Sequence, residues 1–194
     1  MPVTVLVLYH SRHGSVRALA EKIAIGVQSC GAEVMLRTVA GSVDSGGGLH
    51  PEVTLAELAG ADAVAVGSPV RFGLMSAEMK AFWDSTTPLW LKGSLIDKPA
   101  GVFTSSSSMH GGNEATLLGL MLPLLHHGMV LLGVPYDQPA LHQTQAGGTP
   151  YGPSHVTGPT AESQLHADEQ RIAVAFGKRL ATIARQLTQA QSDS

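Results

Sequence analysis

The stretch that decides the fold is VTVLVLYHSRHGSV, residues 3–16. Its first half, Val3–Tyr9, is a continuous run of β-branched, aliphatic and aromatic residues, which is typical of a strand buried on both faces of a parallel sheet. The polar segment His10–Ser15 follows. Apolar residues then recur at helical spacing over residues 16–27, and Gly31 closes that helix. The pattern predicts a strand, a loop and a helix in that order.

The same alternation continues along the chain. Apolar runs predict further strands at Glu33–Val39, Ala61–Gly67, Ala100–Ser105 and Met129–Val134. Helices are expected at residues 54–59 (opened by a Thr54–Glu57 capping box), 76–86 (capped by Ser76), 113–125 and 163–187. The pattern predicts an α/β fold, a flavodoxin-like three-layer sandwich with a five-stranded parallel sheet in the order 2-1-3-4-5. We expect one domain over residues 1–194.

Three other segments are predicted to be irregular. Residues 40–53 are glycine-rich and are expected to form a loop. Residues 135–159 carry five prolines and four glycines, which indicates an excursion too long for a simple connector. Residues 189–194 are expected to be a polar tail.

Composition excludes several classes of protein. Of the 194 residues, 44% are hydrophobic and 14% are charged, which rules out intrinsic disorder for most of the chain. The net charge of −3 and the lack of any Lys/Arg cluster argue against a nucleic-acid partner. A lone cysteine, Cys30, forbids an intrachain disulfide, and neither a secretory signal nor a membrane span is predicted. We therefore expect a cytoplasmic protein without a membrane partner.

The loop after the first strand has the residues of a phosphate site. In a doubly wound sheet, ligands bind beyond the carboxyl ends of the strands. Here Ser11, Gly14 and Ser15 lead into a helix N-terminus, whose free amides and positive dipole end favour an anion. Arg12 can add positive charge. The alternative is an ordinary helix cap, a role that serine often has.

The loops after the third and fourth strands should meet the same ligand. Residues 67–75 (GSPVRFGLM) combine a rigid backbone with apolar surface, against which a planar ring could lie. Residues 104–112 (TSSSSMHGG) supply small hydrogen-bond donors and allow close backbone approach. The alternatives are an ordinary βα loop and a serine-rich linker, respectively.

Several other sites are not predicted. The chain has no G-x-G-x-x-G dinucleotide motif, no P-loop and no G-x-S-x-G elbow. It has nine histidines, but no histidine has an acidic or cysteine partner at ligand spacing, so we expect no metal site. Cys30 lacks basic neighbours and is not expected to be a nucleophile.

Four ordered motifs together resemble a known family: YHSRHG at residues 9–14, GSPVRFG at 67–73, HHGM at 126–129 and GGTPYG at 147–152. Over about Val3 to Leu187 the chain is similar to the WrbA-type NAD(P)H:quinone oxidoreductases, which are flavodoxin-like FMN enzymes. The resemblance implies FMN as cofactor and NADH or NADPH as electron donor. His13 stands where the family often has tyrosine, so the choice between NADH and NADPH stays open.

The resemblance also implies site residues. Catalytic roles fall to His127, near the flavin rim, and Trp90, facing the substrate pocket. The implied cofactor-binding residues are Ser11, Arg12, His13, Gly14, Ser15, Val16, Pro69, Val70, Arg71, Phe72, Gly73, Ser105, Ser106, Ser107, Ser108, Met109 and His127. Without the resemblance, His127 would be interpreted as a helix-end histidine, and Trp90 as a packing residue or an interface residue.

The predicted function is two-electron reduction of quinones by NAD(P)H in a ping-pong mechanism. The low charge, Trp83, Trp90 and the apolar excursion at residues 135–159 indicate assembly beyond the monomer, and the resemblance implies a homo-oligomer, a dimer or tetramer. Two alternatives remain: a flavodoxin-type electron carrier and a flavin-binding regulatory protein. Carriers usually surround the flavin with acidic residues, whereas the loops here carry Arg12, Arg71 and histidines.

Overall fold

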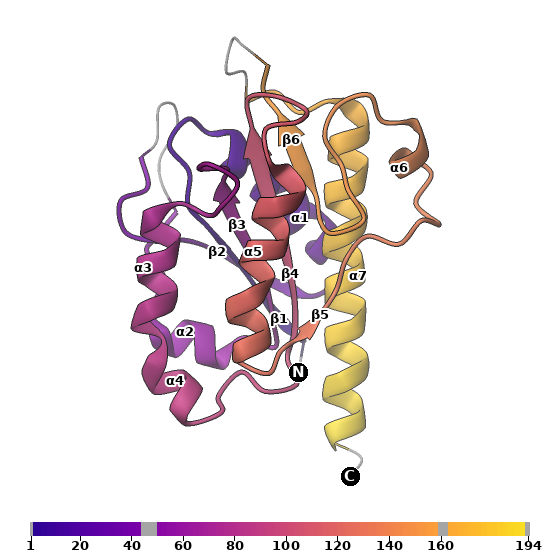
Figure 1. The fold of residues 1–194 in the computed structure, drawn as a ribbon. Helices are drawn as coiled ribbons and strands as arrows, with labels where there is room; N and C mark the ends of the chain where they lie inside the picture. Colours follow the sequence, from indigo (N-terminus) through magenta and orange to yellow (C-terminus); the bar gives the residue numbers. More distant parts are fainter. Residues whose placement is uncertain (1, 44–49, 159–162, 193–194) are drawn as a thin grey trace.

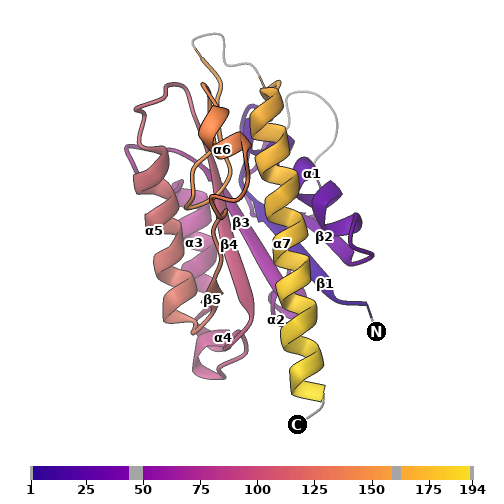
Figure 2. The same cartoon turned by 90° about the vertical axis from the view of Figure 1, so that its right-hand side faces the viewer.

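A computed structural model describes residues 2–43, 50–158 and 163–192 (Figure 1). A parallel sheet runs through the centre, and helices cover both of its faces, as the view in Figure 2 shows. The predicted strand order 2-1-3-4-5 is confirmed. The strands are β1 (Thr4–Tyr9), β2 (Glu33–Thr38), β3 (Ala63–Pro69), β4 (Pro99–Ser106), β5 (Val130–Leu131) and β6 (Ser154–Val156).

The helices form two layers with separate cores. One layer holds α1 (Ser15–Gln28) and α7 (Ala167–Ser192). The other holds α2 (Leu55–Gly60), α3 (Ala77–Ser85), α4 (Thr87–Leu91) and α5 (Asn113–His126). A single turn, α6 (Ala140–Gln143), lies in the excursion after β5.

Alternate residues of β1 explain why its sequence is apolar without interruption. Val5 and Val7 are buried against α1 and α7, and Leu6 and Leu8 are buried in the opposite core. Successive side chains of a strand point to opposite faces, so a strand covered on both sides needs apolar residues at every position.

The fifth strand corrects the prediction of a strand over Met129–Val134. Only Val130–Leu131 pair with β4, opposite Pro99 and Ala100. The chain then leaves the sheet: the Leu132 amide still donates to the Ala100 carbonyl of β4, but the Val134 amide donates to the Pro150 carbonyl, and Pro135 has no amide hydrogen for a ladder. It returns as β6, which pairs in parallel with Thr104–Ser106.

One edge of β4 is thus covered by two short strands separated by an insertion, residues 132–153. The prediction of an irregular excursion over residues 135–159 therefore missed β6. The missed strand is only three residues long and polar at two of them, so it carries no strand pattern.

The C-terminal helix is displaced from its predicted bounds of 163–187. It begins at Ala167 and continues to Ser192, so the polar tail expected from residue 189 onward is helical as far as the structure describes it. Glutamine and alanine are good helix formers, and polarity alone does not end a helix. Trp90 lies beyond the predicted helix of residues 76–86, in the separate short helix α4, which has a proline in its first turn.

Two helix-start signals are confirmed. The Glu57 amide donates to Thr54 Oγ1 at 3.1 Å, and the Thr54 amide donates to Glu57 Oε2 at 2.9 Å, which is the predicted capping box. Ser76 caps α3 by accepting a hydrogen bond from the Met79 amide. Among the described helices, none has the length and apolar character needed to cross a membrane.

Candidate functional site

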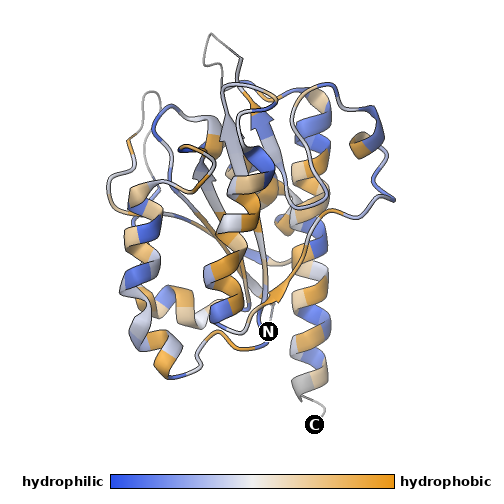
Figure 3. Cartoon of the chain, in the orientation of Figure 1, coloured by the Kyte–Doolittle hydropathy of each residue, from blue (hydrophilic) through white to orange (hydrophobic). Residues whose placement is uncertain are grey.

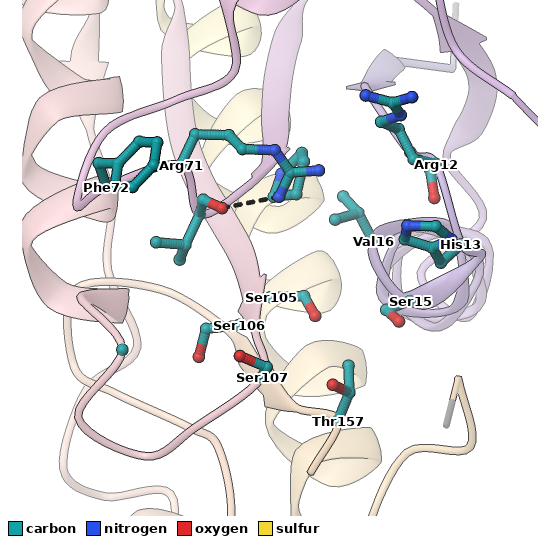
Figure 4. Close-up of a pocket in the computed structure, with 14 residues that line it drawn as sticks. Arg12, His13, Ser15, Val16, Arg71, Phe72, Ser105, Ser106, Ser107 and Thr157 are labelled. Atoms are coloured by element: carbon teal, nitrogen blue, oxygen red, sulfur yellow. Dashed lines mark hydrogen bonds between the residues drawn. The ribbon is translucent and has the colours of Figure 1, made fainter. Parts of the chain in front are cut away.

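A pocket of about 380 Å³ lies where β1, β3 and β4 end. This volume is within the range of small-ligand sites. Its walls come from the loops singled out by the sequence, and Figure 4 shows them facing one another. The lining residues are Ser11, Arg12, His13, Ser15, Val16, Pro69, Val70, Arg71, Phe72, Ser105, Ser106, Ser107, Gly111 and Thr157.

Where α1 lines the pocket, it presents its N-terminus, which no side chain caps. The N-cap is Gly14, which has φ +86° and provides no side-chain cap, and the first turn of α1 contains no acidic residue. Ser11 Oγ accepts a 3.2 Å hydrogen bond from the Gly14 amide, so this serine shapes the turn and does not act as the N-cap. The first amides of the helix therefore lack intrahelical acceptors, and the positive end of the dipole favours an anion here.

An arginine side chain stands on each side of the pocket. Arg12 and His13 are exposed on the α1 wall. Arg71 extends from the opposite wall toward α1, and its Nη1 donates to the carbonyl of Val70 at 2.8 Å (Figure 4). No carboxylate belongs to the lining among the described residues. The electrostatic character of the pocket therefore suits an anionic ligand.

The loop after β3 is held in a strained turn. The amides of Arg71 and Leu74 each donate to the other residue's carbonyl, at 2.8 and 3.0 Å. Between them Phe72 has φ +51°, a conformation that non-glycine residues rarely adopt, and its side chain is fully exposed. The turn thus presents an aromatic ring at the rim of the pocket.

Hydroxyl groups line the wall after β4. Ser105 and Ser106 are buried at the end of the strand, and the Val70 amide donates to the Ser105 carbonyl at 2.9 Å, which joins this wall to the previous loop. Sequence reasoning missed Thr157, which follows β6 and donates its amide to the Ser106 carbonyl at 2.9 Å. It also did not name Gly111, although this residue falls in the predicted serine-glycine loop.

Four of the predicted cofactor residues belong to these loops but not to the described lining of the pocket. They are Gly14, Gly73, Ser108 and Met109. Gly14 and Gly73 shape the backbone through positive φ angles, and Ser108 accepts a hydrogen bond from Ser106 Oγ at its carbonyl.

Trp90 and His127 lie in a different place. Together with Trp83, Thr86 and His126 they line a second pocket of about 490 Å³. This pocket is at the C-terminal end of α5, whereas Gly111 borders the first pocket next to the N-terminal end of α5. A helix of this length extends about 21 Å. Within one chain, the two predicted catalytic residues do not share a cavity with the predicted cofactor loops.

His127 is tightly held in the second pocket. Its Nε2 lies 2.8 Å from Thr86 Oγ1, and its ring packs against Trp83 with centroids 5.6 Å apart. Burial lowers the pKa of His127, and neighbouring His126 acts in the same direction. His127 is therefore neutral at physiological pH.

Buried His10 is the first residue after β1, and it supports the loop that leads into α1. Its Nε2 lies 3.3 Å from the Gly41 carbonyl, and its Nδ1 lies 3.9 Å from Glu78 Oε2. Burial lowers the pKa of His10 even though Glu78 acts in the opposite direction. A neutral His10 donates from Nε2 to the carbonyl, which ties the start of this loop to the segment after β2.

Comparisons with known proteins relate this chain to a family and to named relatives. The family described as NADPH-dependent FMN reductase matches residues 1–137. A protein of Geotalea daltonii named NAD(P)H dehydrogenase (quinone) is 43% identical over 203 residues, covering 96% of this chain and 99% of that protein. A Chromohalobacter salexigens protein of the same name is 42% identical over 196 residues, covering 94% and 98%.

A solved structure agrees with the architecture. The crystal structure of a WrbA-like flavodoxin from Agrobacterium tumefaciens is similar to this chain with a TM-score of 0.72 and 26% identity, covering 95% of this chain and 98% of the other. The predicted flavodoxin-like fold and the WrbA-type resemblance are thereby confirmed.

Proposed function

Because this chain belongs to the NADPH-dependent FMN reductase family, we propose that it is an FMN-dependent NAD(P)H dehydrogenase that reduces quinones. Relatives about 40% identical over nearly the whole chain carry the name NAD(P)H dehydrogenase (quinone). The observation that carries the proposal is the open N-terminus of α1, which faces a pocket lined by serines and arginines and by no carboxylate among the described residues.

The residues of the pocket fit FMN. The free amides at the start of α1, with Ser11 and Ser15, would hold the terminal phosphate, and Arg12 would balance its charge. Val70 and the exposed ring of Phe72 would border the flavin ring. One anion site at a helix N-terminus, without a dinucleotide motif, favours FMN over FAD.

When bound, FMN would supply the redox chemistry, taking two electrons from NADH or NADPH and passing them to a quinone. The chain would orient the ring and stabilise charge. Ser105 and Ser107 provide hydroxyl donors at the wall after β4, where they would meet negative charge on the ring, and Arg71 extends over the same space. The Ser106 hydroxyl already donates to the Ser108 carbonyl and shapes this wall. No protein nucleophile is needed.

Trp90 and His127 would contribute from a second copy of the chain. They lie too far from the cofactor pocket to serve it within one chain, so the predicted catalytic roles require an oligomer. An exposed apolar face supports one: Leu118, Leu122 and Leu125 are each about half exposed along α5. Figure 3 shows hydrophobic segments along the same helix, between hydrophilic ones. We propose a homodimer or homotetramer.

In this proposal, nicotinamide and quinone use the same space above the flavin in turn, which gives a ping-pong mechanism. The enzyme would work in the reducing cytoplasm, since its lone cysteine forms no intrachain disulfide. The test is the absorption spectrum of the purified protein, followed by NAD(P)H oxidation with a quinone. A flavin spectrum with saturable, quinone-dependent oxidation supports the proposal, and a colourless chain that binds no added FMN contradicts it.

A further inference from the structure

Glu169, in the first turn of α7, is a fully buried carboxylate with four hydrogen bonds. Oε1 accepts from the amides of Gly147 at 2.8 Å and Val156 at 3.0 Å. Oε2 accepts from the His166 amide at 2.8 Å and lies 2.7 Å from His155 Nδ1. A buried carboxylate with this many hydrogen-bond donors around it is an integral part of the fold.

The carboxylate is ionised. Burial alone would raise the pKa of Glu169, but hydrogen bonds from His155 and Val156 outweigh burial and hold the pKa below its usual value. An ionised carboxylate only accepts hydrogen bonds, so His155 must carry its proton on Nδ1. The N-terminus of α7 stabilises the negative charge further.

These bonds connect α7 to the cofactor pocket through β6. His155 and Val156 belong to β6, which pairs with the pocket end of β4 over Thr104–Ser106. The next residue, Thr157, donates its amide to the Ser106 carbonyl and lines the pocket between the serine wall and the α1 wall (Figure 4). β6 is only three residues long, so few ladder hydrogen bonds hold it in place.

We propose that Glu169 is a positioning residue for the cofactor: it fixes β6, and thereby places Thr157 against FMN, without touching the cofactor itself. This inference rests on the proposed function, because it takes FMN as the occupant of the pocket. It assigns a role in cofactor binding to a residue that lies outside the pocket and that no motif marks.

The test compares Glu169→Gln with Asp168→Asn in the full-length chain freed of flavin. Asp168 is a matched control: it is the preceding residue, it is also buried, and its carboxylate pairs with Arg171 at 3.0 Å within its own helix. FMN affinity is measured by quenching of flavin fluorescence. Glu169→Gln replaces an acceptor with an amide NH₂ facing backbone donors, so we expect FMN to bind about tenfold more weakly, with less than about a twofold change for Asp168→Asn.

A double-mutant cycle with Thr157→Ala separates positioning from a general loss of stability. If Glu169 acts through Thr157, Thr157→Ala weakens FMN binding in the wild-type chain but not in the Glu169→Gln chain. Together with Asp168→Asn, the effect of Thr157→Ala should persist in full. If Glu169→Gln does not fold, Glu169→Asp, which keeps the charge but shortens the reach, takes its place in the cycle.

The outcomes are distinguishable. Equal FMN affinity of the wild-type and Glu169 variants, or additive effects in the cycle, overturns this inference and leaves the proposed function standing. A wild-type chain that does not quench FMN fluorescence overturns both.

Discussion

The indole Nε1 of Trp90 donates a 2.9 Å hydrogen bond to the main-chain carbonyl of His126. This bond joins α4 to the C-terminal end of α5, and it holds the indole with about half of its surface exposed. In the intersubunit site that we propose, this exposed, oriented side chain would serve the pocket of another chain, because it lies about a helix length from the pocket of its own chain.

Complementation between two inactive variants tests this arrangement. One variant, Trp90→Ala, lacks the aromatic surface, and the other variant, Ser11→Asp, has a blocked phosphate site. If each site combines the FMN pocket of one copy with Trp90 of another, co-refolding the two variants should restore about a quarter of wild-type quinone reductase activity, because random pairing leaves that share of sites intact. Mixed chains that remain as inactive as the separate variants would contradict an intersubunit site.

The phosphate end of the pocket can be tested with a single added charge. Ser11→Asp places a carboxylate at the open N-terminus of α1, so FMN should bind about 100-fold more weakly through charge repulsion. Riboflavin, which lacks the phosphate, should lose far less affinity. Ser11→Ala removes the hydroxyl without adding charge and should cost about fivefold or less. Equal losses for FMN and riboflavin would show that the phosphate binds elsewhere.

Initial-rate kinetics test whether one space serves both substrates. We expect parallel double-reciprocal plots when NADH or NADPH is varied at several quinone concentrations, because the oxidised nicotinamide must leave before the quinone enters. High quinone should also inhibit competitively against the nicotinamide. Intersecting lines would indicate a ternary complex and two separate subsites.

The Glu57–Arg37 pair predicts a specific pH dependence of stability. Hydrogen bonds from the Arg37 guanidinium, the nearer at 2.6 Å, together with the capping amide of Thr54, lower the pKa of Glu57 to about 2. An acid whose pKa falls on folding stabilises the native state above its unfolded pKa, and that contribution is lost as the pH falls toward the folded pKa.

The measurement is the thermal midpoint of the wild-type protein and of Glu57→Gln at a series of pH values. The difference between them should be constant from about pH 7 to pH 5 and should shrink between about pH 4.5 and pH 2. In an Arg37→Met background most of this pH dependence should disappear. A difference that persists unchanged at pH 2 would exclude the ionised pair as its source.

Most of the fold could be predicted from the sequence, because local sequence signals and tertiary packing agree along most of the chain. The run Val3–Tyr9 is apolar throughout and lies buried on both faces, and Thr54 and Ser76 mark helix starts through caps that form as expected. Among the described residues, fourteen line the first pocket, and the sequence names all of them except Gly111 and Thr157, since strand ends in a doubly wound sheet converge.

The parts of the fold and of the site that could not be predicted depend on contacts between residues far apart in the sequence, which no local pattern encodes. β6 exists because the edge of β4 is open beyond β5 and because Glu169 holds His155 and Val156 there, through partners at least thirteen residues apart. The separation of Trp90 and His127 from the pocket is likewise set by the length and direction of α5. Motif resemblance assigns these two residues a role without showing which chain provides them.

Because β5 and β6 pair with separate parts of one edge of β4, residues 132–153 form an insertion between two short strands. β5 ends opposite Ala100 and β6 begins opposite Thr104, so a chain leaving at Leu131 and returning at Ser154 crosses about 13 Å along the strand. A connector of a few residues could span that gap. Leu132, Val134 and Ala140 of the insertion are buried in the core, and the Gly147 amide donates to Glu169, so these positions are fixed. Sequence length is therefore free to vary only at exposed positions such as Tyr136 and Gln145, where a grafted peptide or reporter domain could be carried, provided that Ser154–Thr157 and their anchor on α7 are retained.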